Sequence, residues 1–444
     1  MRYKYETAAD IIKQKIYSGV YKAGEKLPSI KRLSGELEFN PDTIVKAYKH
    51  LEEEHFIYSV PKSGYYVVKN EDKSGESRKV VDMLKASPPE EINPYKDFYH
   101  CMENAVSIYG EKLFEYSSPK GMTELINSLE KHLMNFQIFV KPENIYITNG
   151  SQQALYILAA MPFPSGKSKV LLEQPTYSLM LDIMRYAKTP AVGIERTSKG
   201  IDLNELEEIF KKGDIKFFYT MPRYQNPTGF SYDTRQKREI LRLAEKYDVY
   251  IVEDDYLADL ELDNKADPMY SLKSKDKVIY IRSFSKTLLP GLRLGAAILP
   301  QELHNDFNCF KYSMDLNTSI INQSALEVFL KSKMYKFHIK RTKNYYRKKM
   351  KALKNASLEY HNENITWYVP ETGIYAYLET KNIKSEELVK SLLNSKVLVC
   401  STTNCYLRGF NHAEGIRLCV CNASDEEIAN AVQIIDAEVK KQPV

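Results

Sequence analysis

An eleven-residue run without a single apolar side chain, residues 69–79, divides this sequence of 444 residues into two unequal parts. The run reads Lys-Asn-Glu-Asp-Lys-Ser-Gly-Glu-Ser-Arg-Lys, and a segment this polar has nothing to bury in a core. The whole chain is 43% apolar, which is enough for a separate core on each side of the run. We therefore expect two domains, residues 1–69 and 80–444, joined by a linker over residues 70–79.

The first part has the pattern of three short helices followed by a hairpin. Apolar residues recur at helical spacing in the first helix, and Ser29 is suited to cap a second one. Asn40 and Pro41 are favoured at the N-cap and first position of a third helix. Two strand-like runs, residues 57–60 and 65–68, then flank a short turn that contains glycine. This order is the plan of a winged helix-turn-helix.

Such a fold reads DNA with the start of its third helix in the major groove, and its hairpin tip, or wing, lies against phosphates or the minor groove. Side chains and backbone N–H groups at the start of the preceding helix meet phosphate. The DNA contacts predicted on this basis are Lys26, Ser29, Lys31, Thr43, Lys46, Lys62, Ser63 and Gly64. A small helical cap domain with solvated lysines explains the same periodicity, so periodicity alone leaves both interpretations open.

From about residue 80, short β-rich runs alternate with helical stretches. This alternation predicts an α/β domain with a mostly parallel sheet covered by helices. Two long helical stretches near residues 301–332 and 335–356 follow, and from about residue 335 the chain is expected to form a smaller α+β subdomain. The expected strands are Ile145–Thr148, Lys169–Leu172, Phe217–Met221, Val249–Val252 and Val278–Arg282.

A lysine and an arginine follow the last of these strands. Lys286 ends the motif Ser283-Phe284-Ser285-Lys286, and a side chain at the carboxyl end of such a strand faces the crevice where open α/β sheets bind ligands. Arg293 comes seven residues later, where a returning loop could place its guanidinium on a phosphate. By itself, such a motif is more often a solvated loop.

Acidic residues follow another buried strand, in the run Glu253-Asp254-Asp255-Tyr256. Buried carboxylates are costly unless they meet a cation, and a protonated pyridine ring is one such cation. An ordinary acidic turn and a metal site are the alternatives, but no histidine lies nearby in the sequence to favour a metal. We expect no metal, and we expect Asp254 to face the ring.

The remaining strand ends carry an amide, a phosphate cradle and an aromatic ring. Asn226 lies in a tight Pro-Gly turn, and Ser151 and Gln152 open a helix after a glycine. Tyr177 could stack on a ring. Together these five strand ends supply what pyridoxal 5′-phosphate (PLP) needs: a lysine for its aldehyde, an acid for its ring nitrogen, donors for its phosphate and a stacking partner.

Residues 5–68 resemble the DNA-binding domain of the GntR family of bacterial regulators, through Ala23–Ser29, Asn40–Tyr48 and the segment from Leu51 to Gly64. Asn40-Pro41-Asp42 departs from the Ser-Arg that many members carry before the threonine, which bears on the base contacts. The region from about residue 80 to the C-terminus resembles the class I/II, fold-type I PLP-dependent aminotransferases.

The second resemblance implies a role for each motif residue. Lys286 is the Schiff-base lysine, Asp254 pairs with the pyridine nitrogen, and Asn226 and Tyr256 bind the phenolic oxygen. Arg417 would bind an effector carboxylate, and Tyr116 would reach the partner subunit's site. The phosphate-binding and stacking residues implied are Ser151, Gln152, Ser283, Ser285, Arg293 and Tyr177.

A GntR-type reader joined to such a domain resembles the MocR subfamily of regulators, usually head-to-tail homodimers that sense PLP or an amine. Some members carry an arginine where Leu179 stands, so a second effector carboxylate lacks that partner. We therefore expect a cytoplasmic, PLP-dependent transcriptional regulator that binds a double-stranded DNA operator and senses PLP, an amino compound or both through an aldimine at Lys286. The sequence contains no run of 18 or more apolar residues, so we expect no membrane span. An active aminotransferase with a DNA-targeting domain, and a scaffold that PLP merely stabilises, remain alternatives.

Overall fold

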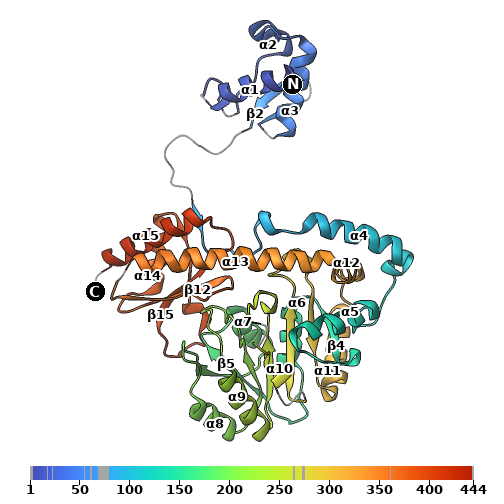
Figure 1. The fold of residues 1–444 in the computed structure, drawn as a ribbon, viewed down its shortest axis with the longest axis vertical. Helices are drawn as coiled ribbons and strands as arrows, with labels where there is room; N and C mark the ends of the chain where they lie inside the picture. The colour runs from blue at the N-terminus through green and yellow to red at the C-terminus, as the bar shows by residue number, and fades with distance from the viewer. Residues whose placement is uncertain are drawn as a thin grey trace. The chain divides into compact units, whose positions relative to one another are not determined.

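The computed structural model describes residues 4–442 except residues 18, 23, 55, 61, 62, 69–79, 264, 265, 273–275 and 361. The chain divides into two compact units, residues 1–79 and 80–444 (Figure 1). The predicted linker over residues 70–79 and the predicted DNA contact Lys62 lie outside the described residues. No helix in the described part of the chain is long and apolar enough to cross a membrane.

The first unit has the predicted winged helix-turn-helix order of three helices and a hairpin. The Ser29 side chain caps α2 by accepting from the Arg32 amide, and Asn40 caps α3 by accepting from the Asp42 amide. Its small core packs Ile12, Leu33 and further apolar side chains of all three helices. The elements are α1 (Lys4–Tyr17), α2 (Ile30–Leu37), α3 (Pro41–Glu53), and the antiparallel strands β1 (Ile57–Val60) and β2 (Gly64–Val67).

A seven-stranded sheet forms the centre of the second unit. Strand β10 runs antiparallel to both of its neighbours, and the other strand pairs are parallel, as the predicted α/β class requires. All five predicted strands belong to this sheet. In sheet order the strands are β4 (Ile145–Thr148), β10 (Gly295–Ile298), β9 (Val278–Ser283), β8 (Tyr250–Asp254), β7 (Ile215–Thr220), β5 (Lys169–Gln174) and β6 (Ala191–Glu195).

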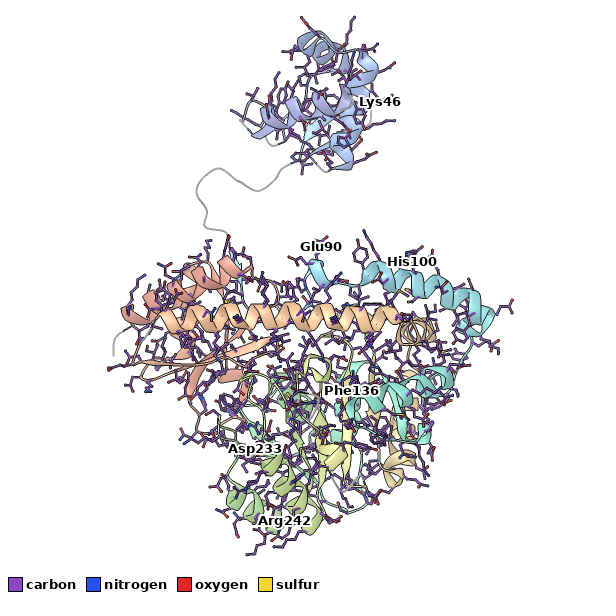
Figure 2. The ribbon with its side chains drawn as sticks, viewed as in Figure 1. Lys46, Glu90, His100, Phe136, Asp233 and Arg242 are labelled. Atoms are coloured by element: carbon purple, nitrogen blue, oxygen red, sulfur yellow. The ribbon has the colours of Figure 1, made fainter. Side chains whose placement is uncertain are left out.

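Helices cover the two faces of this sheet and complete two apolar cores. Side chains project from every element of both units, among them Asp233, which caps α9, and Arg242 further along the same helix (Figure 2). The helices before the long C-terminal ones are α4 (Tyr95–Tyr109), α5 (Thr123–Leu133), α6 (Gly150–Ala160), α7 (Ser178–Tyr186), α8 (Leu203–Lys211), α9 (Thr234–Lys246) and α10 (Met269–Leu272).

The long stretch predicted over residues 301–332 is not one helix. It divides into α11 (His304–Asp315) and α12 (Ile320–Lys331), because Leu316 adopts a left-handed φ of 55° and Ser319 caps the second helix. The stretch predicted over residues 335–356 lies within α13 (Lys333–Glu359), a 27-residue helix that packs on α12 and α15 (Figure 1).

The C-terminal subdomain is α+β, as expected. A four-stranded antiparallel sheet has the order β11 (Ile365–Tyr368), β12 (Tyr375–Thr380), β15 (Glu414–Cys419) and β14 (Cys400–Ser401), with helices α14 (Ser385–Asn394) and α15 (Asp425–Lys441). One pairing had no sequence signal: β3 (Val81–Asp82), at the very start of this unit, runs parallel to β13 (Val397–Leu398). The first residues after the linker thus pack with the C-terminal subdomain.

Candidate functional site

The predicted DNA-contacting residues that the structure describes lie before and on α2, on α3 and in the hairpin of the first unit. Lys46 is exposed on α3 (Figure 2), and Thr43 is half-buried in its first turn. The backbone of Lys26 forms an isolated antiparallel β-bridge with Tyr66 of β2. A Cβ added at Gly64, where φ is 120°, would lie 3.3 Å from Lys26 Cε. The structure therefore brings Lys26 beside the wing.

The other two helix-start residues and the wing serine are also near the surface. Lys31 is exposed in the first turn of α2, where its ammonium and the free amides of the helix start suit a phosphate. Ser29 uses its side-chain oxygen as the helix cap, so its remaining contribution is a hydroxyl proton. Ser63 Oγ lies 2.6 Å from the Tyr66 hydroxyl. Arg32, with an exposed guanidinium paired to Glu36, is a cation of this face that the sequence analysis missed.

One cavity of about 410 Å³ in the second unit gathers the predicted cofactor residues. Arg417 also lines it, whereas Tyr116 does not and is 87% exposed elsewhere on the unit. Met221, Tyr375 and the segment Leu84–Ser87 also line the wall, and none of them was predicted from the sequence. The predicted cofactor residues in the wall are Ser151, Gln152, Tyr177, Asn226, Asp254, Tyr256, Ser283, Ser285, Lys286 and Arg293.

A buried carboxylate, Asp254 at the end of β8, forms the floor of this cavity. Its Oδ2 accepts a hydrogen bond of 3.0 Å from the Tyr219 hydroxyl, while Oδ1 has no partner among the described residues. Burial raises the pKa of Asp254 from 3.8 to about 7, because the charged form is desolvated. A half-satisfied buried acid is costly, and a ligand nitrogen that carries a proton would satisfy it.

Lys286 enters the cavity from the loop after β9. Its Nζ donates to the Ala86 carbonyl oxygen at 2.7 Å. Burial lowers the pKa of Lys286, and the nearby thiols of Cys421 and Cys419 oppose this effect. A lowered pKa leaves more of the amine unprotonated at neutral pH, which is the form that attacks an aldehyde.

The N-terminus of α6 and the Arg293 loop form an anion cradle. A Cβ at Gly150, where φ is 69°, would lie 2.9 Å from Arg293 Nη2, so a side chain here would push the guanidinium away from the helix start. Arg293 itself has a left-handed φ of 51°, an uncommon backbone for arginine that turns it toward α6. Its Nη2 also donates to Gln152 Oε1 at 3.3 Å. Backbone amides, serines and a guanidinium together suit a dianionic phosphate.

Side-chain hydrogen bonds orient the polar groups between the cradle and the floor. Arg417 Nη1 donates to Asn226 Oδ1 at 3.1 Å, which leaves the Asn226 amide nitrogen as a donor. Arg417 Nε is buried without a partner among the described residues. Gln152 Nε2 donates to the Tyr177 hydroxyl at 3.2 Å. The Tyr256 hydroxyl, predicted to bind a ligand oxygen, donates instead to the Tyr224 carbonyl at 2.6 Å in this structure.

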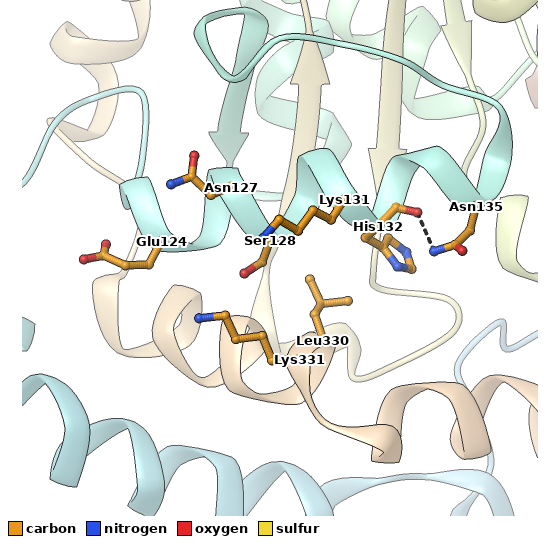
Figure 3. Close-up of a pocket in the computed structure, with 8 residues that line it drawn as sticks. All are labelled: Glu124, Asn127, Ser128, Lys131, His132, Asn135, Leu330 and Lys331. Carbon is orange, nitrogen blue, oxygen red and sulfur yellow. Dashed lines mark hydrogen bonds between the residues drawn. The ribbon is translucent and has the colours of Figure 1, made fainter.

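A second hollow, of about 460 Å³, lies between α5 and the end of α12 (Figure 3). None of the predicted site residues lines it. Its wall includes the imidazole of His132, whose Nε2 accepts from Arg282 Nη2 at 3.2 Å. Burial and the Arg282 charge lower the pKa of His132 to about 3, so this imidazole is neutral at pH 7. The surrounding lysines and Glu124 are of mixed charge, which favours no particular ligand.

The residues present fit PLP on three independent features. The unpartnered Oδ1 of Asp254 suits a protonated ring nitrogen, the glycine-dependent cradle suits a phosphate, and the Lys286 amine suits an aldehyde. The fold and the site thus define a PLP-binding protein of the aminotransferase fold that also carries a helix-turn-helix unit.

Comparison with known proteins agrees with this class. The chain belongs to the family "Aminotransferase class I and II", which matches residues 93–435, and residues 4–67 match "Bacterial regulatory proteins, gntR family". These matches confirm the predicted fold class, the MocR-type combination of modules and the PLP cofactor.

Two whole-chain relatives are named as regulators. The chain is 39% identical to the "Uncharacterized HTH-type transcriptional regulator YcxD" of Bacillus subtilis (strain 168), over 97% of this chain and 99% of that one. It is 25% identical to the "HTH-type transcriptional regulator NorG" of Staphylococcus aureus (strain USA300), over 94% of this chain and 100% of that one.

Solved structures match the second unit. LysN, the alpha-aminoadipate aminotransferase of Thermus thermophilus, complexed with N-(5'-phosphopyridoxyl)-L-leucine, is 25% identical with a TM-score of 0.74. The match covers 81% of this chain and 92% of that chain. The kynurenine aminotransferase of Pyrococcus horikoshii has the same fold, with a TM-score of 0.76 at 24% identity over 82% of this chain and 92% of that chain.

Proposed function

We propose that this protein is a DNA-binding transcriptional regulator whose affinity for its operator depends on what occupies the cavity around Lys286. The observation that carries the proposal is the presence, in one chain, of a helix-turn-helix unit and a cavity with every group that PLP requires. The regulator names of whole-chain relatives support it. Six cysteines, all free, are compatible with a reducing cytoplasm as its location.

Each cavity residue has one task in this proposal. Lys286 Nζ would hold the cofactor through its aldehyde, Asp254 would keep a proton on the ring nitrogen, and Asn226 would donate from its amide nitrogen. The α6 start, Ser285 and Arg293 hold the phosphate. When bound there, PLP supplies an aldehyde that reacts reversibly with amines.

The effector in this proposal is an amino compound with one carboxylate. Arg417 lies in the cavity wall with Nε unpartnered among the described residues, and a guanidinium binds a carboxylate in a bidentate manner. Leu179, 39% exposed on α7, offers no charge to a second carboxylate. A second effector carboxylate therefore finds no partner at position 179.

A head-to-tail homodimer is part of the same proposal. Large apolar side chains gather in the exposed part of α4 and the turn after it, while the opposite side of α4 packs on α12. Exposed apolar groups at this density are typical of a protein interface. These side chains are Tyr95, Tyr99, Val106, Ile108, Phe114 and Tyr116. Tyr116 would then reach the partner's cavity, and light scattering of the purified protein measures the dimer directly.

Two measurements test the proposal. Borohydride reduction of the PLP-loaded protein, followed by peptide mass spectrometry, should place the cofactor on Lys286. DNA affinity, measured on the fragment upstream of the protein's own gene, should differ between the free protein, the PLP-loaded protein and the loaded protein with an amine. Unchanged affinity across all three states and a full panel of amines would reject ligand control.

An active aminotransferase is the second candidate, favoured by the completeness of the site and the lowered pKa of Lys286. Once displaced by a substrate amine, Lys286 would move the proton that transamination requires. Repeated, rapid conversion of an amino acid to its keto acid would support the enzyme. Normal regulation by a Lys286→Ala protein would instead support a scaffold that PLP merely stabilises.

A further inference from the structure

The first eight residues after the linker, Val80–Ser87, form a strap that belongs to the second unit. Its outer half, Leu84–Ser87, lines the ligand cavity. Its inner half contains β3, which begins at Val81, two residues after the end of the linker. One short segment is therefore both a wall of the cavity and the point where the chain leaves for the DNA-binding unit.

Backbone hydrogen bonds fix the inner half of the strap to the C-terminal subdomain. The Val81 amide donates to the Lys396 carbonyl at 2.8 Å, and the Met83 amide donates to Leu398 at 3.0 Å. The Met83 carbonyl accepts from the amide of Cys419 at 2.8 Å. The side chains of Val81 and Met83 are buried in the main core, so this half follows any movement of the subdomain.

The same subdomain strand carries the effector-binding candidate. Arg417 and Cys419 both belong to β15, and the residue between them is fully buried. The Lys85 carbonyl accepts from the Cys419 thiol at 3.3 Å and from Asn422 Nδ2 at 2.9 Å. Cys419, two positions after Arg417 on β15, bonds the strap directly. A displacement of Arg417 along or across β15 therefore acts on the strap through Cys419.

The outer half of the strap contacts Lys286, which lies in the loop after strand β9 of the seven-stranded sheet. Lys286 Nζ donates to the Ala86 carbonyl at 2.7 Å. Within the strap, Asp82 Oδ1 accepts from the amides of Leu84 and Lys85, both at 2.9 Å, so the two halves are joined by a hydrogen-bonded turn. A covalent bond at Lys286 Nζ changes the hydrogen-bond donor available to the Ala86 carbonyl. The turn at Asp82 then passes this change to β3.

We propose that the strap transmits the state of Lys286 and Arg417 to the linker, and so to DNA binding. This inference rests on the proposed function, since it names the route by which the same cavity controls the operator. The route needs no contact between the two units, because β3 is covalently continuous with the linker. It predicts that a change at Ala86 is felt at the amides of Val81 and Met83.

Hydrogen exchange tests this transmission without DNA or ligand. In Lys286→Met, Ala86 loses its donor, so the amides of Leu84 and Lys85 and those of Val81 and Met83 should exchange about three- to tenfold faster. Lys277→Met, immediately before β9, breaks ion pairs with Asp248 and Glu302 and is the matched control that leaves the strap unchanged. If exchange rises only at residues 84–87, or nowhere in the strap, the proposal is overturned.

A pair of neighbouring proline variants tests the link to DNA. Val81→Pro removes the amide that bonds Lys396, whereas the Val80 amide has no hydrogen bond among the described residues, so Val80→Pro is the control. The probe is N-(5'-phosphopyridoxyl)-L-alanine, a stable adduct with a phosphate for the cradle and a carboxylate for Arg417. Calorimetry establishes that each variant binds it, and Val81→Ala, which keeps the amide, controls for core packing.

The wild type and Val80→Pro should change their DNA affinity by at least about fivefold on adding the adduct, and Val81→Pro by less than about twofold. Full coupling in a folded, adduct-binding Val81→Pro protein overturns the proposal. A wild type whose strap amides respond to Lys286→Met, but whose DNA affinity ignores every ligand, refutes the proposed function and leaves the strap's response intact.

Discussion

Replacing Asp254 by asparagine should change the stability of this protein in opposite directions with and without PLP. The carboxyl is fully buried, with one oxygen bonded to Tyr219 and the other unpartnered among the described residues. Without a ligand, the negative charge is a burden that asparagine removes. With PLP bound, the same charge is the partner of the ring nitrogen, and asparagine weakens that pair.

The magnitude follows from the raised pKa of Asp254, about 7 against an ordinary 3.8. A carboxyl that holds its proton more tightly when folded lowers stability progressively above pH 4, and the loss is complete above pH 7. Three pH units at about 1.4 kcal/mol each amount to a gain in unfolding free energy of about 4 kcal/mol. An amide proton of the introduced asparagine that lacks a partner reduces this gain, so we expect about 2–4 kcal/mol. For residues 80–444, about 2 cal/mol/K of unfolding entropy per residue converts this to a Tm rise of about 3–5 °C at pH 8.

Thermal unfolding at pH 5 and pH 8, with and without PLP, measures both effects. Without PLP, Asp254→Asn should gain most at pH 8 and little at pH 5. Loss of a charged hydrogen bond, worth about 1.5–3 kcal/mol, should also weaken PLP binding by about 10- to 150-fold. A variant less stable than wild type at pH 8 without PLP, or one that binds PLP as tightly, would falsify the assignment of Asp254.

Asp259 is the matched control for this experiment. It is equally buried, but its Oδ1 accepts from Arg282 at 2.6 Å, and that cation holds the pKa of Asp259 below its ordinary value. Asp259→Asn should therefore lose about 3–5 kcal/mol both with and without PLP, because it leaves Arg282 without its counter-charge. The contrast separates a carboxylate prepared for a ligand from one that holds the fold.

Three further predictions concern the cradle, the effector and DNA. Gly150→Ala should weaken PLP binding by at least about tenfold, with an unchanged circular dichroism spectrum, because its Cβ displaces Arg293 from the helix start; equal affinity in an absorbance titration would contradict the cradle. Arg417→Gln should keep PLP affinity but lose about 1.5–3 kcal/mol of adduct binding by calorimetry, and a selective loss of PLP instead would place Arg417 on the cofactor. Lys46→Ala should lower DNA affinity for all sequences and reduce the slope of log affinity against log salt by about one, whereas loss of sequence preference alone would mean that Lys46 reads a base.

Most of the cofactor residues that the sequence revealed share one property: each lies at the carboxyl end of a buried strand or in the segment that follows it. Parallel strands bring their carboxyl ends to one edge, so Asp254 after β8 and Lys286 after β9 had to converge whatever the intervening helices did. Tyr219 escaped detection because it lies inside β7, where a tyrosine is equally typical of a core. Its hydroxyl becomes meaningful only once β7 and β8 are known to be neighbours.

The features that the sequence did not reveal depend on long-range pairing. Strand β3 is two residues long and pairs with β13, more than 300 positions later, so it has no local signal. The break between α11 and α12 lies at Leu316, whose left-handed backbone follows from the loop geometry and not from its own preference. The spacing of apolar residues does not reveal such a break, so the sequence pattern predicted one helical stretch instead of two helices.

The arrangement of the cavity sets a limit on what can act as a signal. A ligand shifts an equilibrium only by its difference in affinity for the two states. The Asp254 floor and the α6 cradle both lie at strand ends of one sheet, so groups bound only there meet a single packed body in either state. Arg417 and the strap belong instead to the C-terminal subdomain and its anchored segment. A ligand that reaches both bodies is the one whose binding free energy depends on their relative position. The cofactor lysine reaches the second body through its hydrogen bond to the Ala86 carbonyl. An amino compound held by Arg417 adds a charged contact to it, so the amine, more than the cofactor, should set the occupancy of DNA.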